Sequence, residues 1–200
     1  CLMFAAILVP LRTPQERAAY LLTHFWDSLN FADTLHSRNS IFMEQNLISY
    51  FSLFPHVQAE ARIMAVKSLM QRAEVDETAY RLLARLAEKH LYTFGSPMQN
   101  EEYFIPFLEE IVGTSLLDET EKSRFRFLLS AALKNRPGTM ATDFTYLTPN
   151  GELQTLYTVP ATYRLLLLFY DPDCLHCREI ITALSTASCL QQQIESGQLT

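Results

Sequence analysis

The sequence contains few glycines. Among its 200 residues there are five, at positions 95, 113, 138, 151 and 197, whereas a usual share is ~7%. Isolated glycines of this kind suit turns and helix ends better than a phosphate-binding loop, and neither a P-loop nor a dinucleotide-binding fingerprint is present. The common nucleotide-binding classes are therefore excluded.

Basic residues are also scarce. The chain carries 16 lysines and arginines against 22 acidic residues, a formal charge of −6. Without a basic stripe, phosphate-driven binding of nucleic acid is disfavoured. With 48% hydrophobic residues, the chain is long and apolar enough for one large domain or two small ones.

No apolar run is long enough to span a membrane. Residues 2–9 form such a run directly after Cys1, but a spanning helix needs ~20 residues. Three interpretations remain open: the end of a signal peptide, the start of a lipoprotein anchored through acylated Cys1, or an apolar strand or tether.

Helical patterns fill residues 12–136. Thr13-Pro14-Gln15-Glu16 has the form of a capping box, Ser96-Pro97 repeats that chemistry, and Asp118 to Glu121 is a weaker instance. Apolar spacing predicts helices near 14–30, 40–54, 57–74, 77–93, 97–113 and 119–135. We expect Pro106 to kink or split the fifth helix.

The pattern changes after Pro137-Gly138. Apolar residues flank a Pro149-Asn150-Gly151 turn, which predicts a hairpin. Residues 163–170 are apolar except for Arg164 and predict a buried strand, and a helix is predicted over 174–195. We therefore expect an α-helical domain over 1–136 and an α/β domain over 137–200.

Three of the four cysteines lie near the end, and two form Cys174-Leu175-His176-Cys177 at the start of the last predicted helix. Cysteines three apart on one helical turn lie ~5–6 Å apart, within the range of a disulfide. The helix amides favour the Cys174 thiolate, so Cys174 is the predicted nucleophile and Cys177 the resolving thiol. His176, if protonated, is expected to lower the pKa of Cys174 further, against the opposing charges of Asp171 and Asp173.

The sequence gives less support to other functions of the Cys174–Cys177 motif. A zinc site needs further ligands at suitable spacing, and the sequence offers none. Haem attachment is excluded because Arg178, not histidine, follows Cys177. A purely structural role for the two cysteines remains open. No metal or cofactor is predicted. Cys189 lies ~18 Å beyond Cys177 on the same predicted helix and is expected to be a buried hydrophobe.

The stretch from Ala141 through the hairpin to Cys177-Arg178-Glu179 resembles the first half of a TlpA/ResA-type thioredoxin-like domain, a class of bacterial envelope thiol-disulfide oxidoreductases. The helical part, with His24-Phe25-Trp26-Asp27 and Leu133-Lys134-Asn135-Arg136, resembles an uncharacterised helical domain that precedes such domains. The resemblance implies protein disulfides as substrates, a thioredoxin-like electron donor, and a periplasmic or envelope location.

The resemblance is incomplete, because 62 residues follow Gly138 and a thioredoxin-like domain has roughly 100. Either the chain is a fragment or another chain completes it. We predict a mainly α protein, a helical bundle followed by a partial thioredoxin-like α/β domain, that acts as a thiol-disulfide oxidoreductase. The alternative is a scaffold whose helical domain binds a partner protein.

Other polar residues are interpreted as structural. Glu101, Glu102, Glu109 and Glu110 are expected on the solvated face of an amphipathic helix. His24, Trp26 and Asp27 are expected to pack or support the first helix. The remaining histidines are expected at the surface or at helix ends; they are His36, His56 and His90.

Overall fold

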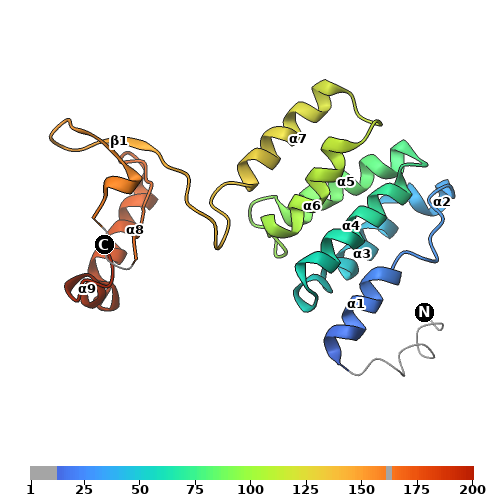
Figure 1. The fold of residues 1–200 in the computed structure, drawn as a ribbon, viewed down its shortest axis with the longest axis horizontal. Coiled ribbons are helices and arrows are strands. Elements are labelled where there is room, and N and C mark those ends of the chain that lie inside the picture. The colour runs from blue at the N-terminus through green and yellow to red at the C-terminus, as the bar shows by residue number, and fades with distance from the viewer. Residues whose placement is uncertain (1–12, 161–163) are drawn as a thin grey trace. The chain divides into compact units, whose positions relative to one another are not determined.

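The structure is a computed structural model that describes residues 13–160 and 164–200. The expectations for Cys1 and for the apolar run 2–9 lie outside these residues. The chain divides between Met140 and Ala141 into two compact units, coloured from blue to yellow and from orange to red in Figure 1. It is mostly helical, with a small two-stranded sheet.

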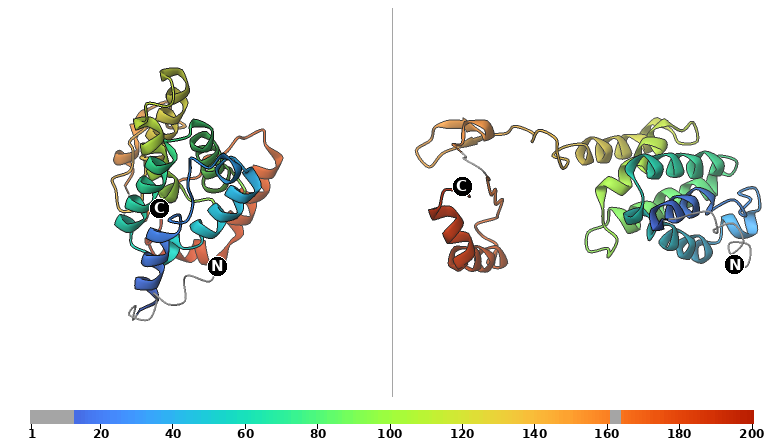
Figure 2. Two further views of the ribbon diagram at one scale, coloured as in Figure 1. Left: turned by 90° about the vertical axis from the view of Figure 1, so that its right-hand side faces the viewer. Right: turned by 60° about the horizontal axis from the view of Figure 1, so that its bottom comes forward.

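The first unit is α-helical, and Figure 2 shows its helices from two further directions. Among the longer helices, α6 packs against α4, α5 and α7, and α3 packs against α5. The elements are α1 (Pro14–His24), α2 (Thr34–Ser37), α3 (Ser40–Phe51), the short 3-10 helix η1 (Phe54–His56), α4 (Ala59–Ala73), α5 (Glu77–Leu91), α6 (Glu101–Gly113) and α7 (Glu119–Ala132).

Two predicted helix starts are confirmed. Thr13 caps α1 and Asp118 caps α7, each in a complete capping box with the glutamate three residues later. Such boxes satisfy amides that the first helical turn leaves without partners. Local chemistry alone was enough to place these two ends.

The predicted start at residue 97 is wrong. Helix α6 begins at Glu101, with the Asn100 side chain accepting from the Tyr103 amide at 3.3 Å. The Ser96 hydroxyl instead donates to the carbonyl of His90 at 2.6 Å. Ser96 therefore helps to close the α5–α6 loop rather than to start a helix.

Pro106 does not split α6, so of the two expected effects, a kink or a split, the split is wrong and the kink stays a prediction. The helix continues from Glu101 to Gly113, and Pro106 is buried within it. Proline removes one main-chain hydrogen bond, but burial of the neighbouring Ile105 and Phe107 favours the continuous helix. Packing therefore outweighs the local cost.

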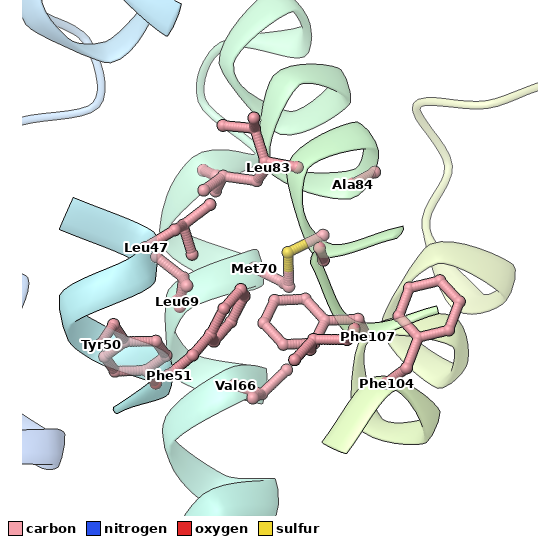
Figure 3. Close-up of a cluster of buried hydrophobic side chains, with 14 of the residues drawn as sticks. Leu47, Tyr50, Phe51, Val66, Leu69, Met70, Leu83, Ala84, Phe104 and Phe107 are labelled. Atoms are coloured by element: carbon pink, nitrogen blue, oxygen red, sulfur yellow. The ribbon is translucent and has the colours of Figure 1, made fainter. Parts of the chain in front are cut away.

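The core of the first unit lies where α3, α4, α5 and α6 meet (Figure 3). The ring of Phe51 from α3 meets Phe107 from α6 edge to face, with centroids 5.8 Å apart. Both side chains are fully buried, as are Met70 from α4 and Leu83 from α5. Burial of each large apolar side chain contributes roughly 1.5–3 kcal/mol.

A single arginine holds the turn that follows α1. Arg72, near the end of α4, donates through Nη2 to the carbonyls of Trp26 at 2.8 Å and Leu29 at 3.0 Å. Its guanidinium also lies 5.9 Å from the ring centre of Phe31. Helix α4 therefore fixes the connection between α1 and α2.

The second unit begins with the predicted hairpin, which is confirmed. Strands β1 (Thr145–Leu147) and β2 (Leu153–Thr155) pair antiparallel, with Tyr146 opposite Gln154. Gly151 has a φ of +81° in the turn, a conformation that glycine adopts without strain. The short 3-10 helix η2 (Leu156–Thr158) follows.

The strand predicted over 163–170 is not formed in its described part. Residues 164–170 have no regular structure, although Thr200 bonds to them in a parallel pattern. The Thr200 amide donates to Arg164 and the Leu166 amide donates to Thr200, both at 2.9 Å. A strand needs a neighbour along its length, and within the described residues this pairing reaches only its beginning.

The helix predicted over 174–195 is two helices, α8 (Leu175–Thr186) and α9 (Ser188–Glu195), with a bend visible in Figure 1. Ala187 between them has an extended conformation, with φ −71° and ψ 106°.

No helix within 13–160 or 164–200 is long and apolar enough to cross a membrane.

Candidate functional site: the cysteine pair at the start of α8

Cys174 is the N-cap residue of α8. Its backbone is extended, with φ −80° and ψ 115°, and its Sγ accepts a hydrogen bond from the Cys177 amide at 3.3 Å. A sulfur in this position faces the free amides and the positive end of the helix dipole. The sequence therefore places a nucleophilic atom where the helix stabilises negative charge.

The pKa of Cys174 lies below its ordinary value, in the direction expected. The main cause is a hydrogen bond from the Cys177 side chain, followed by the Cys177 amide, while desolvation by burial opposes both and the His176 amide adds a smaller lowering contribution. Hydrogen bonds to the charged form of an acid favour that form. The site therefore favours a thiolate at Cys174.

Cys177 lies one turn into α8 and is half-buried, as is Cys174. Both are free thiols. Ile181 and Leu184, spaced four and seven residues after Cys177, share its half-buried state, while Leu175 is 72% exposed. Cys177 thus lies on the partly covered side of α8, as a second thiol one turn from Cys174.

Arg178, for which the sequence predicted no role in the site, shapes the loop before Cys174. Arg178 donates through Nε to the carbonyl of Pro172 at 2.9 Å. The Cys174 amide donates to the carbonyl of Asp171 at 3.1 Å, which closes a turn. The signal was available: Arg178 follows Cys174 by four residues, one helical turn.

The expected role of the His176 ring needs correction. The ring points to Glu179, with Nδ1 3.5 Å from Oε2, and the side chain is 80% exposed. Only the main-chain amide of His176 contributes to the lowered pKa of Cys174. Since the imidazole lies against a carboxylate in water, it is not what stabilises the thiolate here.

The expectation for Cys189 is also wrong. Cys189 lies on α9, beyond the bend at Ala187, and is exposed. The predicted burial assumed one continuous helix with an apolar side, whereas no residue of α9 is buried. Cys189 is therefore not part of a packed core.

The glutamates of α6 do not form a uniformly solvated face. Glu102 is half-buried and accepts from Arg136 at 2.6 and 2.8 Å, and this arginine lowers the pKa of the Glu102 carboxyl. Burial raises the pKa of Glu110, which is also half-buried. Glu102 is therefore paired with an arginine, and Glu110 is partly removed from solvent.

The histidines of the first unit divide into exposed and half-buried groups. His24 is half-buried, with Nδ1 2.6 Å from Asp27 Oδ2, and His36 is exposed, with Nδ1 2.9 Å from Asp33 Oδ2. His56 is exposed.

His90 lies in the last turn of α5, at a helix end as expected, and is half-buried. Its side chain is 14% exposed, and Nε2 lies 2.7 Å from Glu44 Oε1. It therefore joins α5 to α3.

Within the part of the chain that the structure describes, no group of three or more histidine, cysteine or acidic residues could hold a metal ion.

A similarity to a solved structure indicates the class of protein. The chain is similar to the crystal structure, at 1.90 Å resolution, of a thioredoxin-like protein from Bacteroides caccae ATCC 43185. The two share 36% sequence identity with a TM-score of 0.83, over 95% of this chain and 68% of that one.

The particular family follows from the helical part. Residues 4–135 match the family described as a domain of unknown function (DUF5106), and the chain belongs to that family. No curated protein matches the chain.

Proposed function

We propose that the protein is a thiol-disulfide oxidoreductase that exchanges the Cys174–Cys177 dithiol with disulfides of other proteins. The observation that carries the proposal is the position of Cys174 Sγ, which caps α8 and accepts from the Cys177 amide at 3.3 Å. Thiolate, not thiol, is the nucleophile in disulfide exchange. Similarity to a thioredoxin-like protein supports the same chemistry.

The first step is attack by the Cys174 thiolate on one sulfur of a substrate disulfide. A new S–S bond joins Cys174 to the substrate, the substrate S–S bond breaks, and its second sulfur leaves as a thiolate. The helix amides that stabilise the Cys174 thiolate make this group available near neutral pH.

The second step is resolution by Cys177. Its thiol loses a proton to solvent and attacks Cys174 Sγ, and the remaining substrate sulfur leaves as a thiolate. The substrate gains two electrons and the protein ends with a Cys174–Cys177 disulfide. The spacing of one helical turn permits this bond. A dithiol protein, for which we propose a thioredoxin-like donor, then reduces the disulfide.

We place this exchange in the bacterial envelope, an oxidising compartment in which protein disulfides persist. The site residues of the proposal are Cys174 and Cys177, with the His176 amide as support.

The test is reduction of insulin disulfides by the protein with dithiothreitol as electron source. We expect turnover above the rate with dithiothreitol alone, loss of that excess in Cys174→Ser, and retention in Cys189→Ser. Serine preserves a capping oxygen at position 174, so the variant removes the nucleophile without removing the cap. Equal rates for the protein, Cys174→Ser and dithiothreitol alone would refute the enzymatic function and favour the scaffold alternative.

A further inference from the structure

The surroundings of Cys174 carry an excess of negative charge. Residues 171–179 contain three carboxylates and one arginine, namely Asp171, Asp173, Glu179 and Arg178. Asp171 and Asp173 are exposed, and neither has an ion-pair partner in the described part of the chain. Both therefore act on whatever approaches Cys174.

Arg178 offsets only one of these three carboxylates. Its Nε donates to the neutral Pro172 carbonyl, so the guanidinium keeps its charge, and three carboxylates against one arginine leave a net charge of −2 over residues 171–179. The thiolate of Cys174 adds a further negative charge when the site is reactive.

The two aspartates have fixed positions relative to the sulfur. The Asp173 amide donates to Asp171 Oδ1 at 2.9 Å, and the Cys174 amide donates to the Asp171 carbonyl at 3.1 Å. The turn keeps both carboxylates within three residues of Cys174, on the solvent side. Charges at such separations act on a ligand within a Debye length, ~8 Å at physiological salt.

We propose that Asp171 and Asp173 select substrates whose disulfide is flanked by lysine or arginine, and disfavour those flanked by acidic residues. This inference rests on the proposed function, because it concerns the partner of the same exchange reaction. A cationic segment lowers the repulsion between the acidic loop and the incoming sulfur, whereas an anionic segment raises it. Leu175, 72% exposed beside Cys174, offers the same segment an apolar contact.

The experiment uses two synthetic peptide disulfides that differ only in the residues flanking the cysteine, two lysines in one and two glutamates in the other. The reduced protein reacts with each at neutral pH, and the second-order rate constants are measured in 20 mM and 500 mM NaCl. The reaction of each peptide with 2-mercaptoethanol, whose only charge is that of the reacting thiolate, corrects for intrinsic differences in reactivity.

We expect the corrected lysine-to-glutamate rate ratio to be roughly three- to tenfold at low salt and to approach one at high salt. The Asp171→Asn/Asp173→Asn double variant should lose at least half of this preference, and asparagine at 171 retains the oxygen that accepts from residue 173. Glu195→Gln should keep the full preference. Glu195 is the last residue of α9, beyond the bend at Ala187, and lies outside the loop that precedes Cys174.

Two results would overturn the inference. One is a corrected ratio near one for the unmodified protein at low salt, and the other is a preference that the double variant retains in full. In both cases exchange itself still stands. Absence of any reaction above the rate of Cys174→Ser would instead refute the proposed function, and with it the preference.

Discussion

Arg38 and Asp76 connect two helix ends that lie 38 residues apart in sequence. Asp76 caps α5 by accepting from the Ala79 amide at 2.8 Å, and the same carboxylate accepts from Nε of Arg38, the C-cap residue of α2, at 3.2 Å. Arg38 is the largest cause that lowers the pKa of Asp76. The Asp76 side chain thus caps its own helix and also pairs with an arginine 38 residues earlier in the chain.

Replacement of Asp76 by alanine should destabilise the helical unit by about 1–2 kcal/mol, since it removes both the cap and the ion pair. Asp76→Asn retains the capping oxygen and should cost less than Asp76→Ala. Urea unfolding followed by circular dichroism measures both. Equal losses for the two variants would show that the cap contributes nothing beyond the charge.

The core at Phe107 should be far more sensitive than the surface of α7. Phe107→Ala removes a fully buried ring that packs on Phe51 and should cost about 3–5 kcal/mol. Phe127, 71% exposed, is the matched control, and Phe127→Ala should change the free energy of unfolding by less than about 0.5 kcal/mol. A large effect at Phe127 would contradict its exposed position.

The lowered pKa of Cys174 predicts a specific pH dependence. Because only the thiolate reacts, the rate of Cys174 alkylation by iodoacetamide should rise with pH, and the midpoint of this rise should lie below the ~8.5 pKa of a free cysteine. Cys177→Ala should raise the pKa of Cys174, as it removes the largest cause of the shift. His176→Ala should leave the pKa nearly unchanged, since the amide remains.

Mass spectrometric mapping of the alkylated cysteines, in a Cys189→Ser background, separates Cys174 from the other thiols. A raised pKa in His176→Ala would restore the histidine ring to the mechanism. A pKa at or above ~8.5 in the unmodified protein would remove the reason to regard Cys174 as activated.

The helical unit should fold without the rest of the chain. A fragment of residues 1–140 retains the core around Phe51 and Phe107 and the ion pair between Arg136 and Glu102. Its thermal unfolding should be cooperative, with the calorimetric enthalpy equal to the van't Hoff enthalpy. A gradual loss of helix on heating would mean that residues beyond 140 are needed.

Features that depend on neighbours in sequence were predicted well. Thr13 caps α1 with the expected glutamate, and Gly151 makes the expected turn. Each follows from a side chain or a backbone conformation that acts within four residues. The position of Cys174 at the start of α8 belongs to the same group, because the strand-like run and the cysteine spacing were both local signals.

Features that depend on distant residues were predicted poorly. Ser96 and Asn100 are both good capping residues, and the choice between them follows from contacts with α5: the Asn100 amide donates to the Leu91 carbonyl at 2.8 Å and Ser96 binds His90. The apolar run from 164 to 170 has the composition of a strand, but pairing requires a neighbour that composition does not supply. The His176 ring is a local exception: it lies 3.5 Å from Glu179, three residues away, and spacing alone did not distinguish this contact from one with Cys174.

The contact of Arg72 with Trp26 and Leu29 sets an order on synthesis. The arginine lies 46 and 43 residues after the two carbonyls that it binds, and ribosomes add ~5–20 residues per second. For roughly 2–9 seconds, therefore, the nascent turn after α1 must rely on water for those hydrogen bonds. A chain whose translation pauses between these residues would expose the turn after α1, without its arginine, to chaperones and proteases.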